Sequence, residues 1–561
     1  MTLSAKARRL FARHTFLVVG TSVLATLGLT TLAFSWQQSL LDLSTISHHW
    51  NAVSETEDTV SWHNEDSSSA AGVGNWTELE ELAVQLELEV GKEEEEMIMD
   101  RESGMSCREG IERKLRVAVY DFTPFHEEVI GSILSSLNDT GLETDMYRRD
   151  FRFGFNDILD TFYPTKGGEA LYRQDQLMPK LQRGEYDALV MTSCDEHWIE
   201  HWSENSFLDQ LPMLTDIPII CLHHEMYAFG KHRKTLLGSA IKQKLTFLSL
   251  GEHVRKLQLD NLEEWDEDGA DKEEIVWRNV PTEVFVPIFP LPPSIPLRSR
   301  LPEKVLPNDV AILGSVNNFG RRGYNELWAD LMTAMGDNPA EWGYEISPLN
   351  GHFIPLPAHS DVKPFRVHLF GGREEGVEIP AELEAHVLVW HGGLDYLDFY
   401  AQLAEMDLVL PILRSDEYIR VRATAAFPAG ILAHVPSLVM PHQLKSYTYL
   451  EPPAIILHPD GTNEVQVVAA MRRGEDPWTA AVVEDSSASL QPEDRLLHSS
   501  LLNGNDARVT ATGSAIRGTD DWDAYTTKVR DSRSLQQVLI AQTSSTLPTS
   551  VGIDCTLQWE S

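Results

Sequence analysis

The most conspicuous feature of the hydrophobic pattern is one long uncharged stretch, Thr15 to Trp36. At about 1.5 Å per residue, roughly 20 such residues match the hydrocarbon thickness of a bilayer. Asp42 is the first charged residue after the stretch, and the charged residues before it are all basic: Lys6, Arg8, Arg9 and Arg13. The positive-inside bias therefore predicts a cytoplasmic tail over residues 1–14 and a transmembrane anchor over 15–36. The alternative is a cleaved signal peptide, whose apolar region is usually only about 7–15 residues long.

This topology predicts a single-pass type II membrane protein of the Golgi or endoplasmic reticulum, with its body in the lumen. Two glycosylation sequons, Asn75-Trp76-Thr77 and Asn138-Asp139-Thr140, are compatible with a secretory compartment. Residues 37–112 are rich in Ser, Glu and Asn, including an acidic stretch from Trp76 to Met99. Because such a composition can bury little apolar surface, we expect a stem that holds the body away from the membrane.

A regular alternation of strand-like and helix-like segments begins at Leu115. The run from Leu115 to Asp121 is continuously apolar, as in a strand buried on both faces, and a segment of helical period follows it. The pattern recurs with a strand at Glu143 to Arg148, a helix at Ala170 to Arg183, and apolar strands at Tyr186 to Cys194, Ile217 to Glu225 and Leu245 to Leu250. This alternation predicts a doubly wound α/β domain with a parallel sheet over residues 113–290.

A proline-rich run from Phe285 to Asn308 interrupts the alternation, because proline disfavours both helix interiors and central strands. We place an interdomain linker at residues 291–308 and a second Rossmann-like domain at 309–475. The second domain repeats the first, with strands at Val310 to Val316, Phe365 to Gly372, His386 to Gly392 and Asp407 to Leu413, and helices at Tyr324 to Met335 and Tyr396 to Met406. Residues 476–561 form a Ser/Thr-rich tail with one helix candidate, Asp521 to Gln542, that could return to the body.

The net charge argues against nucleic-acid binding, and the cysteine count limits the possible disulfides. The 561 residues include 85 acidic and 46 basic side chains, which give a formal net charge of −39. Such a surface repels phosphate backbones, so nucleic-acid binding is not expected. Four cysteines (Cys107, Cys194, Cys221 and Cys555) allow at most two bridges in three complete pairings, and the sequence does not choose between these and buried thiols.

Three segments of the second domain carry a family resemblance. Gly314 to Leu331 (GSVNNFGRRGYNELWADL) resembles the start of the C-terminal domain of GT-B glycosyltransferases, notably fungal membrane-bound ones, and Gly392 to Leu413 and Arg422 to Leu450 are similar to later blocks of that domain. The resemblance implies two Rossmann-like domains, a nucleotide-sugar donor, and a glycan, glycoprotein or glycolipid acceptor. Many retaining members carry two glutamates eight positions apart where this chain has Val421 and Ala429. Other groups therefore hold the donor, or the chain is a non-catalytic membrane-tethered binding protein on the same scaffold.

The donor site is expected near the carboxyl ends of the second-domain strands, where doubly wound sheets bind ligands. A diphosphate leaving group requires cationic or N–H partners. Arg321 and Arg322 follow the first of these strands, and Arg420 and Arg422 are the second pair of candidates. Asp416 and Glu417 lie nearest to the missing glutamates and could hold the donor sugar or ribose.

Catalytic candidates for the acceptor side follow strands of the first domain: His126, Asp195 and His224. A histidine or a carboxylate at such a strand end can accept the proton of an acceptor hydroxyl. No cofactor beyond the donor substrate is expected, and no metal, because the chain has no CxxC pair and His223-His224-Glu225 lacks the i, i+4 spacing of zinc proteases. Asp266-Glu267-Asp268 resembles a metal-binding Asp-x-Asp, but no apolar strand leads into it, so we interpret it as a solvated loop.

Overall fold

The computed structural model describes residues 114–475, apart from 122, 124, 149, 164–170, 173–175, 195–215, 227–228, 268–275, 300–305, 318–319, 375–376 and 459–461, together with residues 522–531. The predicted anchor, the stem and most of the C-terminal tail lie outside the described residues. No helix within the described ranges is both long enough and apolar enough to span a bilayer.

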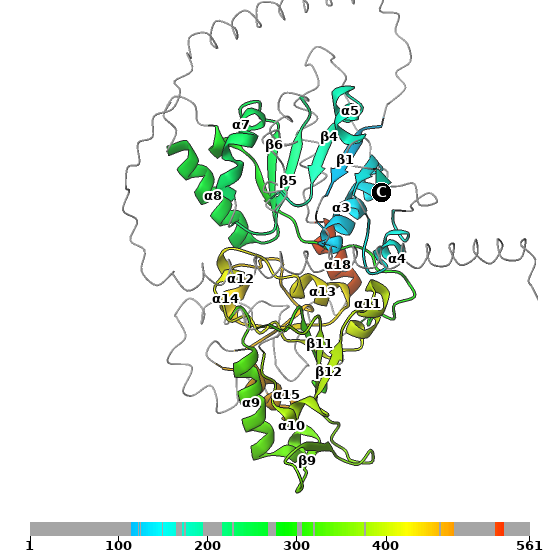
Figure 1. Cartoon of the computed structure of the whole chain (residues 1–561), viewed down its shortest axis with the longest axis vertical. Helices are drawn as coiled ribbons and strands as arrows, with labels where there is room; N and C mark the ends of the chain where they lie inside the picture. The colour runs from blue at the N-terminus through cyan, green and yellow to red at the C-terminus, as the bar shows by residue number, and fades with distance from the viewer. Residues whose placement is uncertain are drawn as a thin grey trace, which may run out of the picture. The chain divides into compact units, whose positions relative to one another are not determined.

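The first domain contains a seven-stranded parallel sheet of strand order β3-β2-β1-β4-β5-β6-β7 (Figure 1). Its strands are β1 (Arg116–Tyr120), β2 (Glu143–Tyr147), β3 (Leu171–Tyr172), β4 (Ala188–Met191), β5 (Ile219–His223), β6 (Leu245–Ser249) and β7 (Thr282–Val284). Its helices are α3 (Glu127–Asp139), α4 (Phe155–Leu159), α5 (Leu177–Gln182), α7 (Arg233–Ile241) and α8 (Glu252–Glu267). The helix expected at Ala170 to Arg183 was placed too early, since Leu171 and Tyr172 pair with β2 as an edge strand.

The sheet is covered on both faces, as the continuous apolar runs predicted. Val117 and Val119 of β1 pack in one cluster with apolar side chains of α3 and α4. Ala118 and Tyr120 pack in another cluster with side chains of α5, α7 and α8. Because successive side chains of a strand point to opposite faces, this partition confirms a doubly wound domain.

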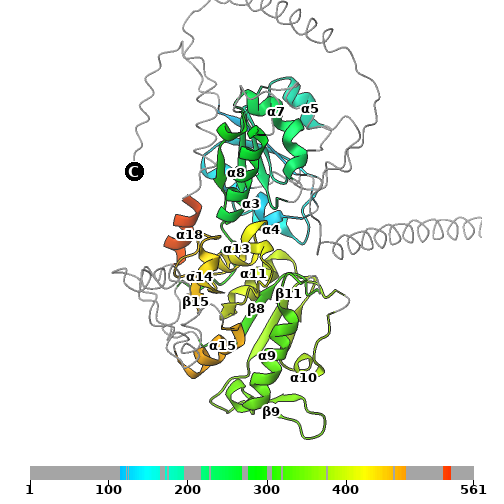
Figure 2. The same ribbon diagram turned by 90° about the vertical axis from the view of Figure 1, so that its left-hand side faces the viewer.

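The second domain contains a six-stranded parallel sheet of strand order β12-β11-β8-β13-β14-β15 (Figure 2). Its strands are β8 (Asp309–Leu313), β11 (Arg366–Phe370), β12 (Leu388–His391), β13 (Leu408–Val409), β14 (Ser437–Val439) and β15 (Ile455–Leu457), beside a separate hairpin of β9 (Tyr344–Ile346) and β10 (Phe353–Pro355). Its helices are α9 (Tyr324–Asp337), α10 (Ala381–Glu384), α11 (Tyr396–Ala404), α12 (Glu417–Arg420), α13 (Ala426–Leu432), α14 (Pro441–Leu444) and α15 (Glu464–Arg473). Two parallel α/β sheets are thus present, as the alternation predicted.

The proline-rich run between the sheets is built into the core. It has no helix or strand where the structure describes it, but Val286, Phe289 and Ile295 are each no more than 5% exposed. The Phe289 ring contacts the rings of Phe155 in α4, at 5.7 Å between centroids, and Tyr400 in α11, at 6.1 Å. The proline-rich run therefore joins apolar side chains of both domains into one cluster.

A helix in the C-terminal tail, α18 (Trp522–Asp531), packs on this body. The Trp522 ring stacks on His434, with 5.2 Å between centroids, and the Tyr525 hydroxyl donates to the carbonyl of Tyr449 at 2.7 Å. Arg530 lies 3.7 Å from Asp139 at the end of α3, so the helix contacts both domains. This agrees with the expectation that a tail helix returns to the body.

A close approach of two glycines fixes the carboxyl ends of β8 and β11. Gly314 and Gly371 have φ values of 106° and 154°, and a Cβ built on Gly371 would lie 2.5 Å from the carbonyl oxygen of Gly314. Since both atoms belong to backbone, no side-chain rotation can relieve that contact.

We therefore expect Gly371→Ala to lower the free energy of unfolding by about 1–3 kcal/mol. The matched control is Gly336→Ala in α9, where an added Cβ meets nothing within 4 Å. That control should be neutral or stabilising by up to about 1 kcal/mol, because alanine is the better helix former. Urea unfolding of the two variants measures the difference, and equal stabilities would contradict the steric argument.

Candidate functional site

A cavity of about 290 Å³ lies where the carboxyl ends of the first-domain strands meet helices of the second domain. Its polar lining includes His126, Glu128, His224, Glu225, Arg422 and Thr424. Its apolar lining includes Val129, Leu250, Pro287 and Leu432. Residues far apart in the sequence therefore line one concave site, as is usual for ligand sites of α/β proteins.

His126 stands at the turn between β1 and α3 in a strained conformation. Its φ and ψ are 70° and 30°, in the left-handed region that residues other than glycine seldom occupy. Its carbonyl accepts hydrogen bonds from the backbone N–H groups of Val129 and Ile130, and its ring stacks on His224 with 3.8 Å between centroids. Such strain persists only where the surrounding structure imposes it, and it is concentrated at functional sites.

A buried ion cluster holds this turn in place. The guanidinium of Arg148 lies 2.9 Å from Glu127 and 3.4 Å from Asp121, and the side chains of all three are at most 3% exposed. Asp121 also accepts hydrogen bonds from the backbone N–H of Thr123, at 2.6 Å, and the hydroxyl of Thr192, at 2.5 Å. Burial raises the pKa of Asp121, while Arg148 opposes that shift. Since Asp121 precedes the turn and Glu127 follows His126, the cluster sets the position of that histidine.

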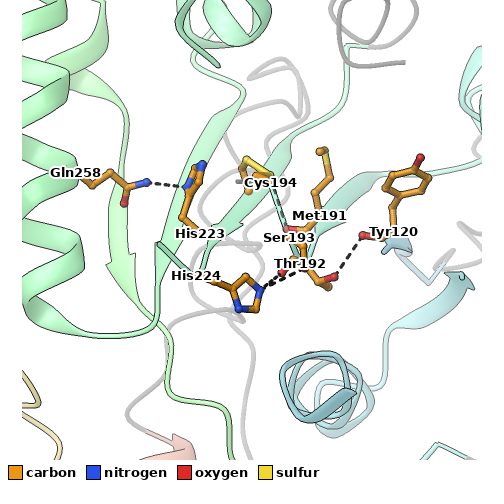
Figure 3. Close-up of a disulfide and its surroundings, with 9 residues drawn as sticks. Tyr120, Met191, Thr192, Ser193, Cys194, His223, His224 and Gln258 are labelled. Atoms are coloured by element: carbon orange, nitrogen blue, oxygen red, sulfur yellow. Dashed lines mark hydrogen bonds between the residues drawn. A yellow bond between two sulfur atoms is a disulfide. The ribbon is translucent and has the colours of Figure 1, made fainter. Parts of the chain in front are cut away.

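His224 is held beneath the end of β4 (Figure 3). Its Nε2 lies 2.8 Å from the carbonyl oxygen of Thr192, and because a carbonyl can only accept, Nε2 carries the hydrogen. Nδ1 is then the basic nitrogen of the neutral ring. Burial, together with neighbouring His126, lowers the pKa of His224 well below its usual range, so the ring is neutral at pH 7.

A disulfide between Cys194 and Cys221 lies next to these contacts (Figure 3). It connects the segment after β4 to β5, with 5.7 Å between the Cα atoms, and selects one of the pairings that the sequence left open. His223 is turned toward α8, where the side-chain amide of Gln258 donates to its Nδ1 at 2.9 Å. In the described part of the chain, no group of three His, Cys, Asp or Glu residues is arranged to hold a metal ion.

Arg422 is the one donor-site candidate among the cavity-lining residues. It forms an ion pair with Glu225 at 2.7 Å and lies 3.4 Å from Glu417. The same Glu417 oxygen lies 3.2 Å from Arg321. His253, at the start of α8, also contacts the Arg422 carbonyl, with its Nε2 at 2.8 Å. Two arginines and two glutamates therefore neutralise one another where the two domains meet.

The remaining candidates from the sequence are not among the described residues that line the cavity. Arg322 donates to the carbonyl of Pro411 at 2.9 Å and lies over the ring of Tyr418. Arg420 and Asp416 pair with each other at 3.4 Å on the surface, where their side chains are 73% and 66% exposed. Asp195 lies outside the described residues. Their assignments to the donor and acceptor sites stay predictions.

Among the cavity residues that the sequence did not mark as site candidates are Glu128 and Tyr400. Glu128 is half-buried, and burial together with adjacent Glu127 raises its pKa. In sequence it is an ordinary acidic residue in the first turn of a helix, where the helix dipole favours negative charge. Tyr400 is a periodic aromatic residue of a buried helix, so nothing local to either residue marks a site.

No family model and no curated protein matches the chain. Among solved structures, it is similar to Anabaena Alr3699/HepE in complex with UDP and glucose, with a TM-score of 0.38, 11% identity, and coverage of 77% of this chain and 100% of that chain. It is also similar to alpha-glucosyltransferase (AGT) in complex with UDP, with a TM-score of 0.38, 9% identity, and coverage of 74% of this chain and 95% of that chain. TM-scores and identities this low do not by themselves establish a shared fold or function.

The ion cluster under His126 gives a stability prediction. Arg148→Ala leaves two buried carboxylates without their cation and should lower the free energy of unfolding by about 3–5 kcal/mol. The control is Arg183→Ala, which breaks an ion pair with Glu185 at a guanidinium that is 58% exposed and should cost at most about 1 kcal/mol. Thermal or urea unfolding measures both, and a similar small loss for each variant would show that the buried cluster is not needed for stability.

Proposed function

We propose that this chain is a metal-independent glycosyltransferase that moves a sugar from a nucleotide-sugar donor to a glycan, glycoprotein or glycolipid acceptor. The observation that carries the proposal is the cavity between the two parallel sheets, in which Arg422, His224 and Glu128 come together. An arginine there suits a diphosphate, and neutral or anionic side chains suit a sugar and its acceptor hydroxyl. The family resemblance of Gly314 to Leu331 agrees with this chemistry.

In this proposal Arg422 binds the donor diphosphate and stabilises the charge that it gains as the glycosidic bond breaks. His126 and His224 line the same cavity from the first domain, and either could orient or deprotonate an acceptor hydroxyl. The lowered pKa of His224 keeps it neutral but makes it a weak base. The strained backbone of His126 and the ion cluster beneath it fix the stacked pair before any substrate binds.

A second candidate function is a non-catalytic, membrane-tethered binding protein. The pairing of Arg422 and Arg321 with Glu225 and Glu417 favours it, because a diphosphate must displace carboxylates that already neutralise these cations. The absence of the paired glutamates at Val421 and Ala429 points in the same direction. Nucleotide binding distinguishes the two functions.

The proposal places the body in the lumen of the Golgi or endoplasmic reticulum behind a type II anchor at residues 15–36. The disulfide between Cys194 and Cys221 supports this location, since such bonds persist mainly in oxidising compartments. Asn138 of the second sequon is exposed at the end of α3, as glycosylation of its side chain requires.

Donor binding is tested with the full-length protein and a panel of UDP, GDP and their sugar conjugates in calorimetric titrations. Arg422→Ala should lower the affinity for the nucleotide by roughly tenfold to over a hundredfold, because it removes a charged hydrogen-bonding partner. Arg414→Ala is the control, since Arg414 pairs with Glu326 at 2.7 Å outside the cavity lining. If the unaltered protein binds no member of the panel, the binding-protein function is favoured.

The orientation is tested by adding protease to sealed microsomes that contain the protein. Only the fragment before about residue 15 should be removed, because the positive-inside bias leaves that tail in the cytosol. Permeabilising the membrane with detergent should then expose the body. Digestion of the body in intact microsomes would contradict the proposed topology.

A further inference from the structure

We propose that Glu128 and Tyr400 form a subsite within the cavity that binds a hydroxyl group of a carbohydrate. The inference rests on the proposed function and names what this part of the site recognises. It joins a residue of α3 in the first domain to a residue of α11 in the second. Neither was among the sequence candidates.

Tyr400 is the first observation. Its side chain is 0% exposed, it lines the cavity, and its hydroxyl has no hydrogen-bond partner among the residues that the structure describes. Buried hydroxyl groups are nearly always paired, so one left open at a cavity wall indicates a ligand. The ring is fixed by Phe399, with 4.9 Å between centroids, and by Phe289. The hydroxyl therefore cannot easily turn away to find another partner.

Glu128 supplies the complementary acceptor. Glu128 lines the same cavity, and its carboxyl oxygens can accept hydrogen bonds from a ligand. Tyr400 lies close enough to Glu128 for the carboxylate, after burial, to raise the pKa of the Tyr400 hydroxyl well above its usual range. The phenol therefore stays protonated and can donate, while the carboxylate accepts.

This pairing suits an alcohol, which can accept one hydrogen bond and donate another. A phosphate is disfavoured at this position, because the Glu128 carboxylate would repel an anion. Val129, Leu250 and Pro287 line the same cavity and can pack against the C–H faces of a sugar ring. Arg422, also in the lining, is the group suited to an anionic portion of the same ligand.

The test combines stability with affinity in the full-length protein. Tyr400→Phe removes a hydroxyl that has no protein partner, so the melting temperature of the ligand-free variant should rise by about 1–3 °C. Its affinity for UDP-glucose or GDP-mannose should fall roughly 2- to 10-fold, with the affinity for UDP or GDP unchanged. Glu128→Ala should show the same selective loss of affinity.

The matched control is Tyr344→Phe. The Tyr344 hydroxyl donates to the carbonyls of Phe365 and His386 at 2.7 and 3.1 Å, so its removal should lower the melting temperature and leave every affinity unchanged. A lower melting temperature for Tyr400→Phe would show that the Tyr400 hydroxyl has a structural partner, and it would overturn the subsite.

The source of the hydroxyl is resolved by saturation-transfer NMR with methyl glucoside, methyl mannoside and methyl galactoside. If the variants bind only the sugar nucleotides more weakly, the subsite holds the donor sugar. If the variants lose only the signals of the methyl glycosides, the subsite holds the acceptor. If both variants bind all of these probes as the unaltered protein does, the proposal is wrong. If the unaltered protein binds glycosides but no nucleotide, the glycosyltransferase proposal fails while the subsite stands.

Discussion

The site depends on the packing of aromatic rings where the two sheets meet. The rings of Phe155 in the first domain and Tyr396 in the second lie 4.8 Å apart between centroids, and Phe289 of the proline-rich run contacts Phe155 and Tyr400. Aromatic side chains bury large areas and prefer defined edge-to-face geometries, so such a cluster fixes direction as well as distance. It brings α11 close enough to α3 for Tyr400 and Glu128 to line the same cavity.

Charged side chains have different roles in the buried ion cluster and at the cavity. Over the whole chain the net charge is −39, yet the buried ion cluster places one arginine, Arg148, against the two carboxylates of Asp121 and Glu127. At the mouth of the cavity, Arg422 is instead matched by Glu225 and Glu417. The first arrangement stabilises the turn in which His126 has a left-handed conformation. The second keeps a cation available only to a ligand that can compete with carboxylates.

Much of the fold followed from short-range patterns. The runs that became β1, β5 and β8 are continuously apolar because both faces of a parallel sheet are covered, and that signal needs no knowledge of the partner. The helix beginning at Tyr324 likewise has an apolar face of the right period. The edge strand at Leu171 was missed because two residues carry no periodic signal, and only pairing with β2 defines it. The linker was placed by its prolines, but its burial depends on apolar surfaces that the sequence does not juxtapose.

The sequence by itself determined the α/β class, the alternation of the main strands and helices, and the strand ends that His126 and His224 follow. It did so because periodicity and proline position act over a few residues. Only the tertiary structure decided that Arg422 and Glu128 line one cavity. It also decided that Arg322 is not part of that lining and donates to the carbonyl of Pro411. The separation between His126 and Arg422 along the chain is bridged by packing between domains, and hydrogen-bond partners at such distances are fixed by shape complementarity rather than by any local residue pattern.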